Sequence, residues 1–354
     1  MHVPDGFFTA SVSIAAGAVA AGGVGVCLRG ARRELDDRTA PMAGLVAAFV
    51  FAAQMLNFPV AAGTSGHLLG GALAAVLAGP YTAVLAMTVV LLIQALLFAD
   101  GGLTALGVNI VLMGIVTAAV GWAVFRLVVR LLPRGRPAVV AGSFAGALVS
   151  VPASALVFTL LFWIGGTAPI EVGTVAAAMG GVHVLIGIGE AVITALTVSS
   201  VLAVRPDLVY GARHLATPLV LRGADGTTRT AEPAAPQAAP ARPRRLAPFG
   251  LAALAVSLLL AGVVSFYASG DPDGLERVAA DHGFDAAERE HDLAGSPLAD
   301  YGVAGVANER LSVGLAGIIG VGVTVAVGGA VCYAARRRTK DETGTAEAPD
   351  RARA

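Results

Sequence analysis

Charged residues are scarce in this chain of 354 residues: they make up 14% of it, whereas a soluble domain usually carries about 25%. Apolar residues make up 56%, and the mean hydropathy is +0.76. This composition is typical of polytopic membrane proteins and excludes an ordinary soluble enzyme. The net charge is zero, so the chain has no positive excess with which to bind nucleic acid.

Lysine and cysteine are also rare. Lys340 is the single lysine among 24 basic residues. A phosphate-binding P-loop requires a lysine after its glycine-rich turn, so ATP hydrolysis through such a loop is excluded. Cys27 and Cys332 are too few for a disulfide framework or a cysteine metal site, and we interpret them as small apolar residues.

Nine apolar stretches are expected to form membrane helices. Eight are clear from their length: 7–28, 42–60, 81–98, 107–126, 139–164, 175–204, 249–267 and 311–334. The ninth, 66–79, is shorter and ends at a Gly-Pro turn. Including it places 21 of the 24 Lys and Arg residues in the cytoplasm and the N-terminus outside. No basic region precedes the first stretch, so we do not expect a cleaved signal peptide.

The predicted fold is an all-α polytopic membrane protein, with a seven-helix bundle and a two-helix C-terminal part. The bundle comprises residues 1–211. Residues 212–248 are rich in proline and alanine and form a cytoplasmic linker. Residues 249–335 contain two helices joined by an external loop, 268–310, and residues 336–354 form a charged cytoplasmic tail.

The N-terminal sequence MHVPDGFF brings three nitrogen atoms within reach of one metal ion. They are the α-amine of Met1 and the amide and imidazole nitrogens of His2. Binding all three closes a five-membered and a six-membered ring and leaves a fourth in-plane position. Such nitrogen-rich, tetragonal sites suit Cu(II) and Ni(II), and Co(II) also fits. The alternative is a chance histidine in a loose terminus.

His67 is the candidate for the fourth donor. It lies in GTSGHLLGG, just past the outer end of the second apolar stretch. Imidazole is the commonest metal ligand in proteins, and the flanking glycines allow close backbone approach. The alternative is a polar histidine at the membrane interface.

Other polar residues could support these ligands. Asp100 begins a DGG sequence and could accept a hydrogen bond from a ligand imidazole or form a turn. Asn57, Gln94 and Asn109 could orient the ligands or form helix-to-helix hydrogen bonds, and we favour the second role.

His183 and Glu190 are seven residues apart, so they share one helix face. A charge inside a membrane span is costly and usually functional. Glu190 could pair with His183, be protonated, or contact a partner subunit. We favour a structural or coupling role over metal ligation. The external loop holds ten acidic residues and three arginines. It could attract cations or simply be a solvated loop that touches the candidate metal site.

Four segments of the sequence resemble the CbiM/NikM family: MHVPDGF at 1–7, GTSGHLLGGALAAVLAGP at 63–80, VVLLIQALLFADGGLTALGVNI at 89–110 and HVLIGIGEA at 183–191. The resemblance covers residues 1–211. Members of that family are substrate-capture (S) components of energy-coupling-factor transporters for cobalt and nickel. The segment DPDGLE at 271–276 resembles the PDGLE domain, which has a CbiN/NikN-like role.

The resemblance implies a near-planar nitrogen site formed by Met1, His2 and His67. It implies Co²⁺ or Ni²⁺ as transported ligand, with no resident cofactor and no catalysis by this chain. The implied partners are a CbiQ/NikQ-like T component and two cytoplasmic CbiO/NikO-like ATPases in the inner membrane of a prokaryote. A planar nitrogen site favours nickel, whereas PDGLE-bearing members are usually linked with cobalt. We lean slightly to cobalt.

Two alternative functions are kept. The first is an intramembrane enzyme that uses His183 and Glu190, although neither an H-E-x-x-H nor a G-x-S-x-G motif is present. The second is a metal sensor or membrane scaffold without transport activity.

Overall fold

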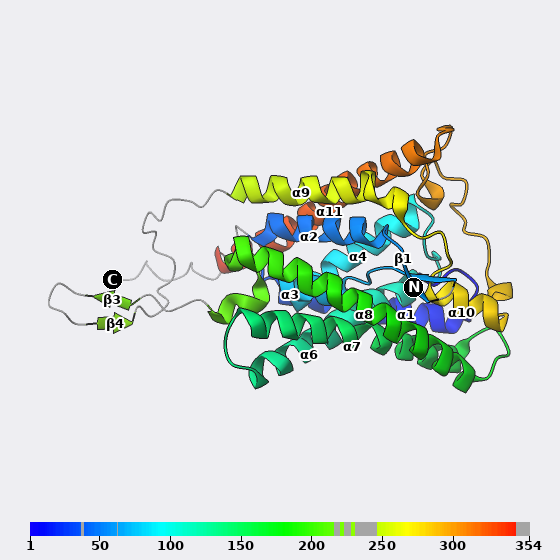
Figure 1. The fold of residues 1–354 in the computed structure, drawn as a ribbon, viewed down its shortest axis with the longest axis horizontal. Coiled ribbons are helices and arrows are strands. Elements are labelled where there is room, and N and C mark those ends of the chain that lie inside the picture. The colour runs from blue at the N-terminus through cyan, green and yellow to red at the C-terminus, as the bar shows by residue number, and fades with distance from the viewer. Residues whose placement is uncertain (37–38, 62, 216–219, 223–227, 231–245, 345–354) are drawn as a thin grey trace, which may run out of the picture.

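The computed structural model describes residues 1–344 except 37–38, 62, 216–219, 223–227 and 231–245. Helices dominate this part of the chain, and the four short strands described there form two hairpins (Figure 1). The prediction of an all-α, polytopic membrane protein is therefore confirmed. The expected linker, 212–248, lies largely outside the described residues, as do residues 345–354 of the expected tail.

The N-terminal part is built mainly from helices that run parallel to the long axis of the molecule in Figure 1. They are α1 (Ala10–Ala31), α2 (Thr39–Gln54), α3 (Gly71–Ala78), α4 (Pro80–Leu97), α5 (Leu106–Asn109), the π-helical η1 (Ile110–Val116), α6 (Thr117–Leu131), α7 (Arg136–Gly165) and α8 (Val172–Val204). The hairpin β1 (Phe58–Ala61) and β2 (Thr64–Gly66) lies between α2 and α3.

The C-terminal part adds two long helices and a short one. The elements after α8 are η2 (Pro206–Leu208), η3 (Tyr210–Leu215), β3 (Val220–Arg222), β4 (Thr228–Thr230), α9 (Leu246–Gly262), η4 (Val264–Tyr267), α10 (Gly274–His282), η5 (Asp285–Ala287), η6 (Ala299–Tyr301) and α11 (Glu309–Gly344). Helix α11 continues past Ala335, where we expected the charged tail to begin.

Seven helices in the described part of the chain are long and apolar enough to cross a membrane. Two of the nine expected stretches are shorter: α2 has 16 residues and α3 has eight. With a rise of 1.5 Å per residue, α3 is only about 12 Å long. The prediction of a helix over 66–79 is therefore correct only for its second half. The first half is not helical: Gly66 ends β2, residues 67–70 lie outside helices and strands, and Gly70 adopts a φ of +86°, which glycine tolerates.

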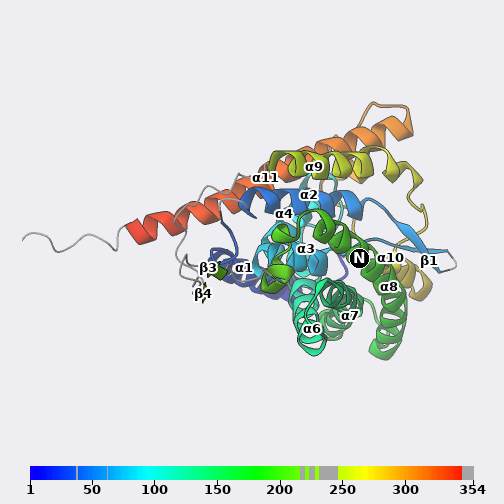
Figure 2. The same ribbon diagram turned by 60° about the vertical axis from the view of Figure 1, so that its left-hand side comes forward.

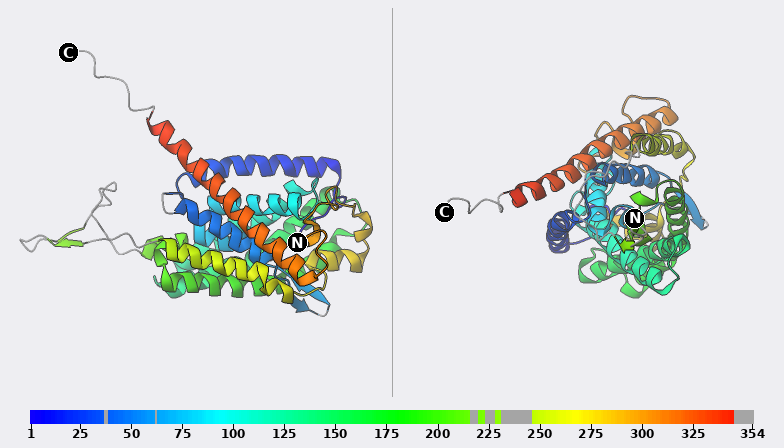
Figure 3. Two further views of the ribbon diagram at one scale, coloured as in Figure 1. Left: turned by 90° about the horizontal axis from the view of Figure 1, so that it is seen from above. Right: turned by 90° about the vertical axis from the view of Figure 1, so that its left-hand side faces the viewer.

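Small residues bring the C-terminal helices close to the bundle. Helices α9 and α11 lie beside α2 in both views (Figures 2 and 3). An added Cβ at Gly44 of α2 would lie 2.8 Å from the backbone nitrogen of Gly329 in α11, so neither helix could keep this approach with a larger residue there. Such close contacts favour helix association where lipid removes the hydrophobic driving force.

The largest buried apolar cluster surrounds the N-terminal segment. Met1 and Phe7 of that segment pack with residues of η1, α7 and α8, and also with Leu275 and Phe284 from the C-terminal part. The rings of Phe7 and Phe284 meet edge to face, with centroids 5.3 Å apart. The two parts of the chain therefore share one core around residue 1.

Candidate metal centre

The first eight residues do not form a helix but enter the protein as an extended segment. Met1 is 2% exposed and Val3 is fully buried. The Val3 amide donates to Asn109 Oδ1 at 2.8 Å, and Asn109 Nδ2 donates to Val3 O at 3.1 Å. Asp5 accepts hydrogen bonds from the backbone amides of Leu103 and Thr104. Asn109 thus bonds to the N-terminal segment next to His2, whereas we had favoured a helix-to-helix hydrogen bond from the sequence.

The terminal amine lies against His67. The Met1 nitrogen is 2.5 Å from His67 Nε2, and the opposite ring nitrogen, Nδ1, is 3.0 Å from the Leu68 carbonyl oxygen. If that Nδ1 carries the proton and donates to the carbonyl, Nε2 keeps its lone pair and faces the amine. Two of the three residues named from the sequence are therefore in direct contact, although 66 positions separate them.

His2 lies beside this pair. The rings of His2 and His67 are 5.1 Å apart between centroids, with planes tilted by 47°. His2 Nδ1 lies 3.3 Å from Asp100 Oδ1 but makes no hydrogen bond among the described residues. Burial, only partly opposed by the charge of Asp100, lowers the pKa of His2 to about 4. Its imidazole is therefore neutral at physiological pH and keeps a free lone pair.

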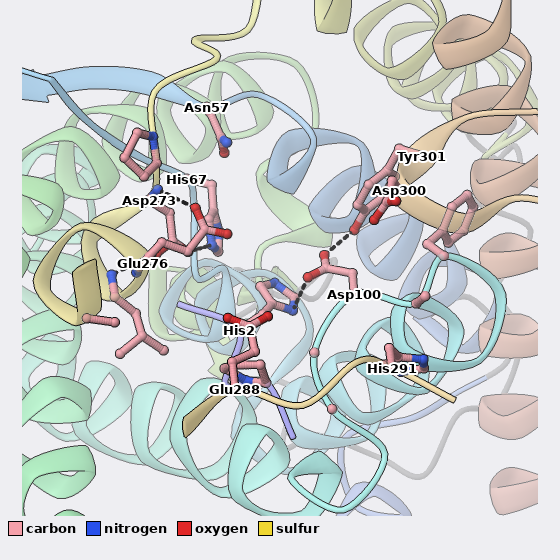
Figure 4. Close-up of a pocket in the computed structure, with 18 of the residues that line it drawn as sticks. His2, Asn57, His67, Asp100, Asp273, Glu276, Glu288, His291, Asp300 and Tyr301 are labelled. Carbon is pink, nitrogen blue, oxygen red and sulfur yellow. Dashed lines mark hydrogen bonds and ion pairs between the residues drawn. The ribbon is translucent and has the colours of Figure 1, made fainter. Parts of the chain in front are cut away.

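Asp100 faces the candidate donor atom of His2 rather than the far side of its ring. The sequence had suggested that this carboxylate either accepts from a ligand imidazole or forms a turn. Its other oxygen, Oδ2, accepts a hydrogen bond from the Tyr301 hydroxyl at 2.5 Å. Figure 4 shows His2, His67, Asp100 and Asp273 around one part of the cavity, with Tyr301 next to Asp100.

Glu190 of α8 holds the segment that carries His67 through hydrogen bonds. This carboxylate, fully buried in α8, accepts from the amides of Leu69 at 2.7 Å and Gly70 at 3.0 Å. Gly70 precedes α3 with its φ of +86°, and an added Cβ would lie 2.4 Å from Val50 Cγ1. Glu190 therefore has a structural role at the entry to α3, one of the roles favoured from the sequence.

His183 does not pair with Glu190. Its Nδ1 lies 2.8 Å from the Met179 carbonyl oxygen in the same helix. Its Nε2 is buried and has no hydrogen-bond partner among the described residues. The Glu190 carboxylate instead accepts from two backbone amides, so the His183–Glu190 pairing considered from the sequence is not formed among the described residues.

The remaining polar candidates have simpler roles. Gln94 donates to Gln54 at 2.9 Å, which joins α4 to α2. Asn57 lines the cavity, and its backbone carbonyl accepts a hydrogen bond from the backbone amide of Ser269. No group of three His, Cys, Asp or Glu side chains in the described residues stands ready to hold a metal. A metal centre here would therefore depend on the terminal amine and a backbone amide.

The C-terminal part covers the site. Four backbone hydrogen bonds join its loop 268–310 to the bundle: Ser65 N to Pro272 O, Ser269 N to Asn57 O, Arg289 N to Asp5 O, and Asp300 N to Phe98 O. Together the two parts enclose a cavity of about 980 Å³. Eight Asp and Glu side chains, three histidines and one arginine line it. This lining gives the cavity a negative potential that would concentrate cations.

Sequence reasoning missed two residues of the C-terminal part. Asp273 Oδ2 lies 2.6 Å from the Met1 nitrogen and 3.5 Å from His67 Nε2. Although burial works in the other direction, the terminal ammonium and His67 hold the pKa of this carboxyl well below its usual range. Tyr301 reaches Asp100. The Asp273-x-x-Glu276 spacing does predict a helix start, but nothing local indicates that Asp273 would face Met1.

Comparisons with known proteins agree with this two-part organisation. Residues 2–208 match the family described as cobalt uptake substrate-specific transmembrane region. Residues 247–337 match the PDGLE domain. Each match covers one of the two parts that enclose the cavity.

Among the similar curated proteins is a putative metal transport protein of Haloquadratum walsbyi, which is 41% identical over 59% of this chain and 94% of its own length. A putative fused nickel transport protein of Archaeoglobus fulgidus is 40% identical over 59% of this chain and 68% of its own length. Among solved structures, a truncated transition metal transporter superposes with a TM-score of 0.52 and 32% identity. It covers 57% of this chain and 99% of its own.

Proposed function

Because this chain belongs to the family of cobalt uptake substrate-specific transmembrane regions, with a PDGLE domain joined to it, we propose that it captures Co²⁺ or Ni²⁺ at the external face of the membrane. The captured metal is then delivered inward by an ATP-driven transporter. The observation that carries the proposal is the 2.5 Å contact between the Met1 nitrogen and His67 Nε2.

The proposed site has four nitrogen donors in one plane. They are the Met1 amine, the deprotonated amide of His2, His2 Nδ1 and His67 Nε2. Chelation by the first three closes a five-membered and a six-membered ring, and the second ring requires Nδ1. In the structure Nδ1 is buried and makes no hydrogen bond among the described residues. Adjacent nitrogen donors at about 2.0 to 2.1 Å from a metal lie about 2.8 Å apart, close to the observed spacing of the Met1 and His67 nitrogens.

The surrounding residues prepare this arrangement. Asn109 fixes Val3, which follows the chelating residues. Glu190 fixes the segment that follows His67. Because both donor segments are held by the protein before metal arrives, less ordering is required on binding. The PDGLE part closes the cavity from outside and gates access of the metal to the N-terminal segment.

Transport then requires partners. We propose that this chain is the S component of an energy-coupling-factor transporter, with a transmembrane T component and two cytoplasmic ATPases on separate chains. The lack of a P-loop lysine in this chain supports separate ATPases. The N-terminus would face the outside and the C-terminus the cytoplasm of a prokaryote, as the distribution of Lys and Arg favours.

The test is metal binding to the full-length protein in detergent, measured by calorimetry and visible spectroscopy with Co²⁺ and Ni²⁺. We expect His2→Ala, His67→Ala and a variant with one residue inserted before Met1 to lose binding. His291→Ala is the matched control, since His291 lines the same cavity but is not a proposed donor. Unchanged affinity and spectrum in the insertion variant would rule out the terminal amine as a ligand and overturn the proposal.

A further inference from the structure

Asp273 begins helix α10 and is held rigidly there. Its Oδ1 accepts hydrogen bonds from the amides of Leu275 at 2.7 Å and Glu276 at 3.0 Å. The Glu276 carboxylate accepts in return from the Asp273 amide at 2.8 Å, which completes a capping box. One oxygen of Asp273 is thus used for the helix, and the other, Oδ2, accepts from the terminal amine of Met1.

Oδ2 lies close to two of the four proposed nitrogen donors. It lies 2.6 Å from the Met1 nitrogen and 3.5 Å from His67 Nε2, and the side chain is 10% exposed. Two ligand atoms at right angles around a metal, with bonds of about 2.0 to 2.2 Å, are about 3 Å apart. That spacing lies between the two observed distances, so a metal bound by both nitrogens on the side that faces Asp273 would lie within reach of Oδ2.

The charges favour the same arrangement. In the proposed site the metal brings two positive charges, and the deprotonated amide of His2 supplies one negative charge. The amine and both imidazoles are neutral. A buried charge that is not balanced is costly, and the Asp273 carboxylate supplies the second negative charge. Asp100 is less suited to this role, because it is 25% exposed and its Oδ2 is engaged by Tyr301.

We propose that Asp273 of the PDGLE part is a fifth, axial oxygen ligand of the captured metal. This inference rests on the function proposed above. It adds a donor from the C-terminal part to the donors of the N-terminal part. It couples cargo binding directly to the C-terminal part, since α10 must be in place for the ligand set to be complete. An axial ligand also reduces the preference of a planar nitrogen set for nickel, because that preference depends on free axial positions.

The test compares the full-length protein with Asp273→Asn and with Asp271→Asn as the matched control. Asparagine caps helices as well as aspartate does, but its NH₂ group cannot replace Oδ2 as a ligand. Asp271 is exposed and its side chain contacts Ser269 rather than the donors. Nickel-loaded samples are examined by X-ray absorption at the nickel edge, and Ni²⁺ and Co²⁺ affinities by calorimetry.

We expect the wild type and Asp271→Asn to give a five-coordinate spectrum. Asp273→Asn should instead show the edge feature of planar four-coordinate nickel and bind metal about 10- to 100-fold more weakly. Asp273→Ser, which also caps the helix, should behave like Asp273→Asn. Agreement between the two variants would show that the change comes from the lost ligand and not from misfolding of α10.

The outcomes separate the two proposals. A planar spectrum in the wild type, or wild-type spectrum and affinity in Asp273→Asn, would show that Asp273 is not a ligand and leave the capture function intact. If His2→Ala and His67→Ala bound metal as well as the wild type, the capture site itself would be wrong, and the role of Asp273 would fail with it.

Discussion

Asn109 and Val3 are joined by two hydrogen bonds that run in opposite directions, at 2.8 and 3.1 Å. Both residues are buried, with Val3 fully shielded from solvent. One asparagine side chain therefore satisfies both backbone polar groups of the residue that follows His2. Because the pair lies away from the proposed donor atoms, it can be removed without deleting a ligand.

Replacement of Asn109 by leucine should leave the Val3 amide unpaired, while the Val3 carbonyl keeps the hydrogen bond from the Gly102 amide. The loss should loosen the N-terminal segment. We expect metal affinity to fall about 10- to 100-fold, as for other residues that orient ligands, while the donor set seen by spectroscopy stays the same. Calorimetry of Asn109→Leu checks this, with Asn308→Leu, which alters an exposed helix cap, as the control. Wild-type affinity in Asn109→Leu would show that Asn109 does not help to hold the N-terminal segment for metal binding.

Glu190→Gln should destabilise the protein and weaken metal binding together. A glutamine offers one carbonyl oxygen, so one of the amides of Leu69 and Gly70 loses its acceptor. An unsatisfied buried group costs about 1 to 3 kcal/mol, and a lower melting temperature in detergent should show it. Glu171→Gln is the control, because Glu171 lies at the start of α8 and makes no cap hydrogen bond. Equal melting temperatures for the two variants would contradict this prediction.

Gly70→Ala should be more damaging than Gly283→Ala, although both glycines have positive φ. The strain of the left-handed backbone, about 1 kcal/mol, is common to both. Only at Gly70 does the new Cβ also meet a neighbour, at 2.4 Å from Val50 Cγ1, whereas Gly283 has open space. Thermal unfolding and metal affinity of the two variants measure the difference. A larger effect at Gly283 would mean that the approach of the His67 segment to α2 is not tight.

Tyr301→Phe should weaken metal binding through Asp100. The phenylalanine keeps the stacking on Phe98, whose ring centroid is 4.8 Å away, but removes the hydroxyl that donates to Asp100. Burial and the charge of Asp100 raise the pKa of Tyr301 well above its usual value, so the hydroxyl is protonated and can donate. We expect a loss of about tenfold in affinity, measured beside Tyr267→Phe, an exposed control. An unchanged affinity would exclude this contribution.

Metal binding should weaken on acidification, because protons compete with the metal for the amine and the amide. His2 contributes little to this competition above about pH 5, since burial lowers its pKa to about 4 and it stays neutral. Between pH 7.5 and 5.5 the affinity should therefore fall as the pH falls, because metal binding releases protons from the ligands. Calorimetry in buffers of different ionisation enthalpy counts these protons, and a pH-independent affinity would contradict amine and amide ligation.

The sequence by itself determined the class of protein and most of its helices, because long apolar runs allow few other structures. Chelate chemistry and the family resemblance also predicted that Met1, His2 and His67 lie close together. The sequence was less accurate where glycines dominate: 66–79 has the hydropathy of a helix, but its first half is not helical. Hydropathy does not reveal that backbone amides in this stretch find an acceptor in Glu190.

Only the tertiary structure decided which groups surround the candidate donors. Asp273 is 272 positions from Met1, and Tyr301 is 201 positions from Asp100. Each looks like an ordinary loop or helix-cap residue in its own sequence context. Their partners are selected by the packing of the C-terminal part against the bundle, where burial makes an unpaired polar group costly. Local sequence patterns carry no record of such long-range pairing, so the fifth donor could be recognised only from the fold.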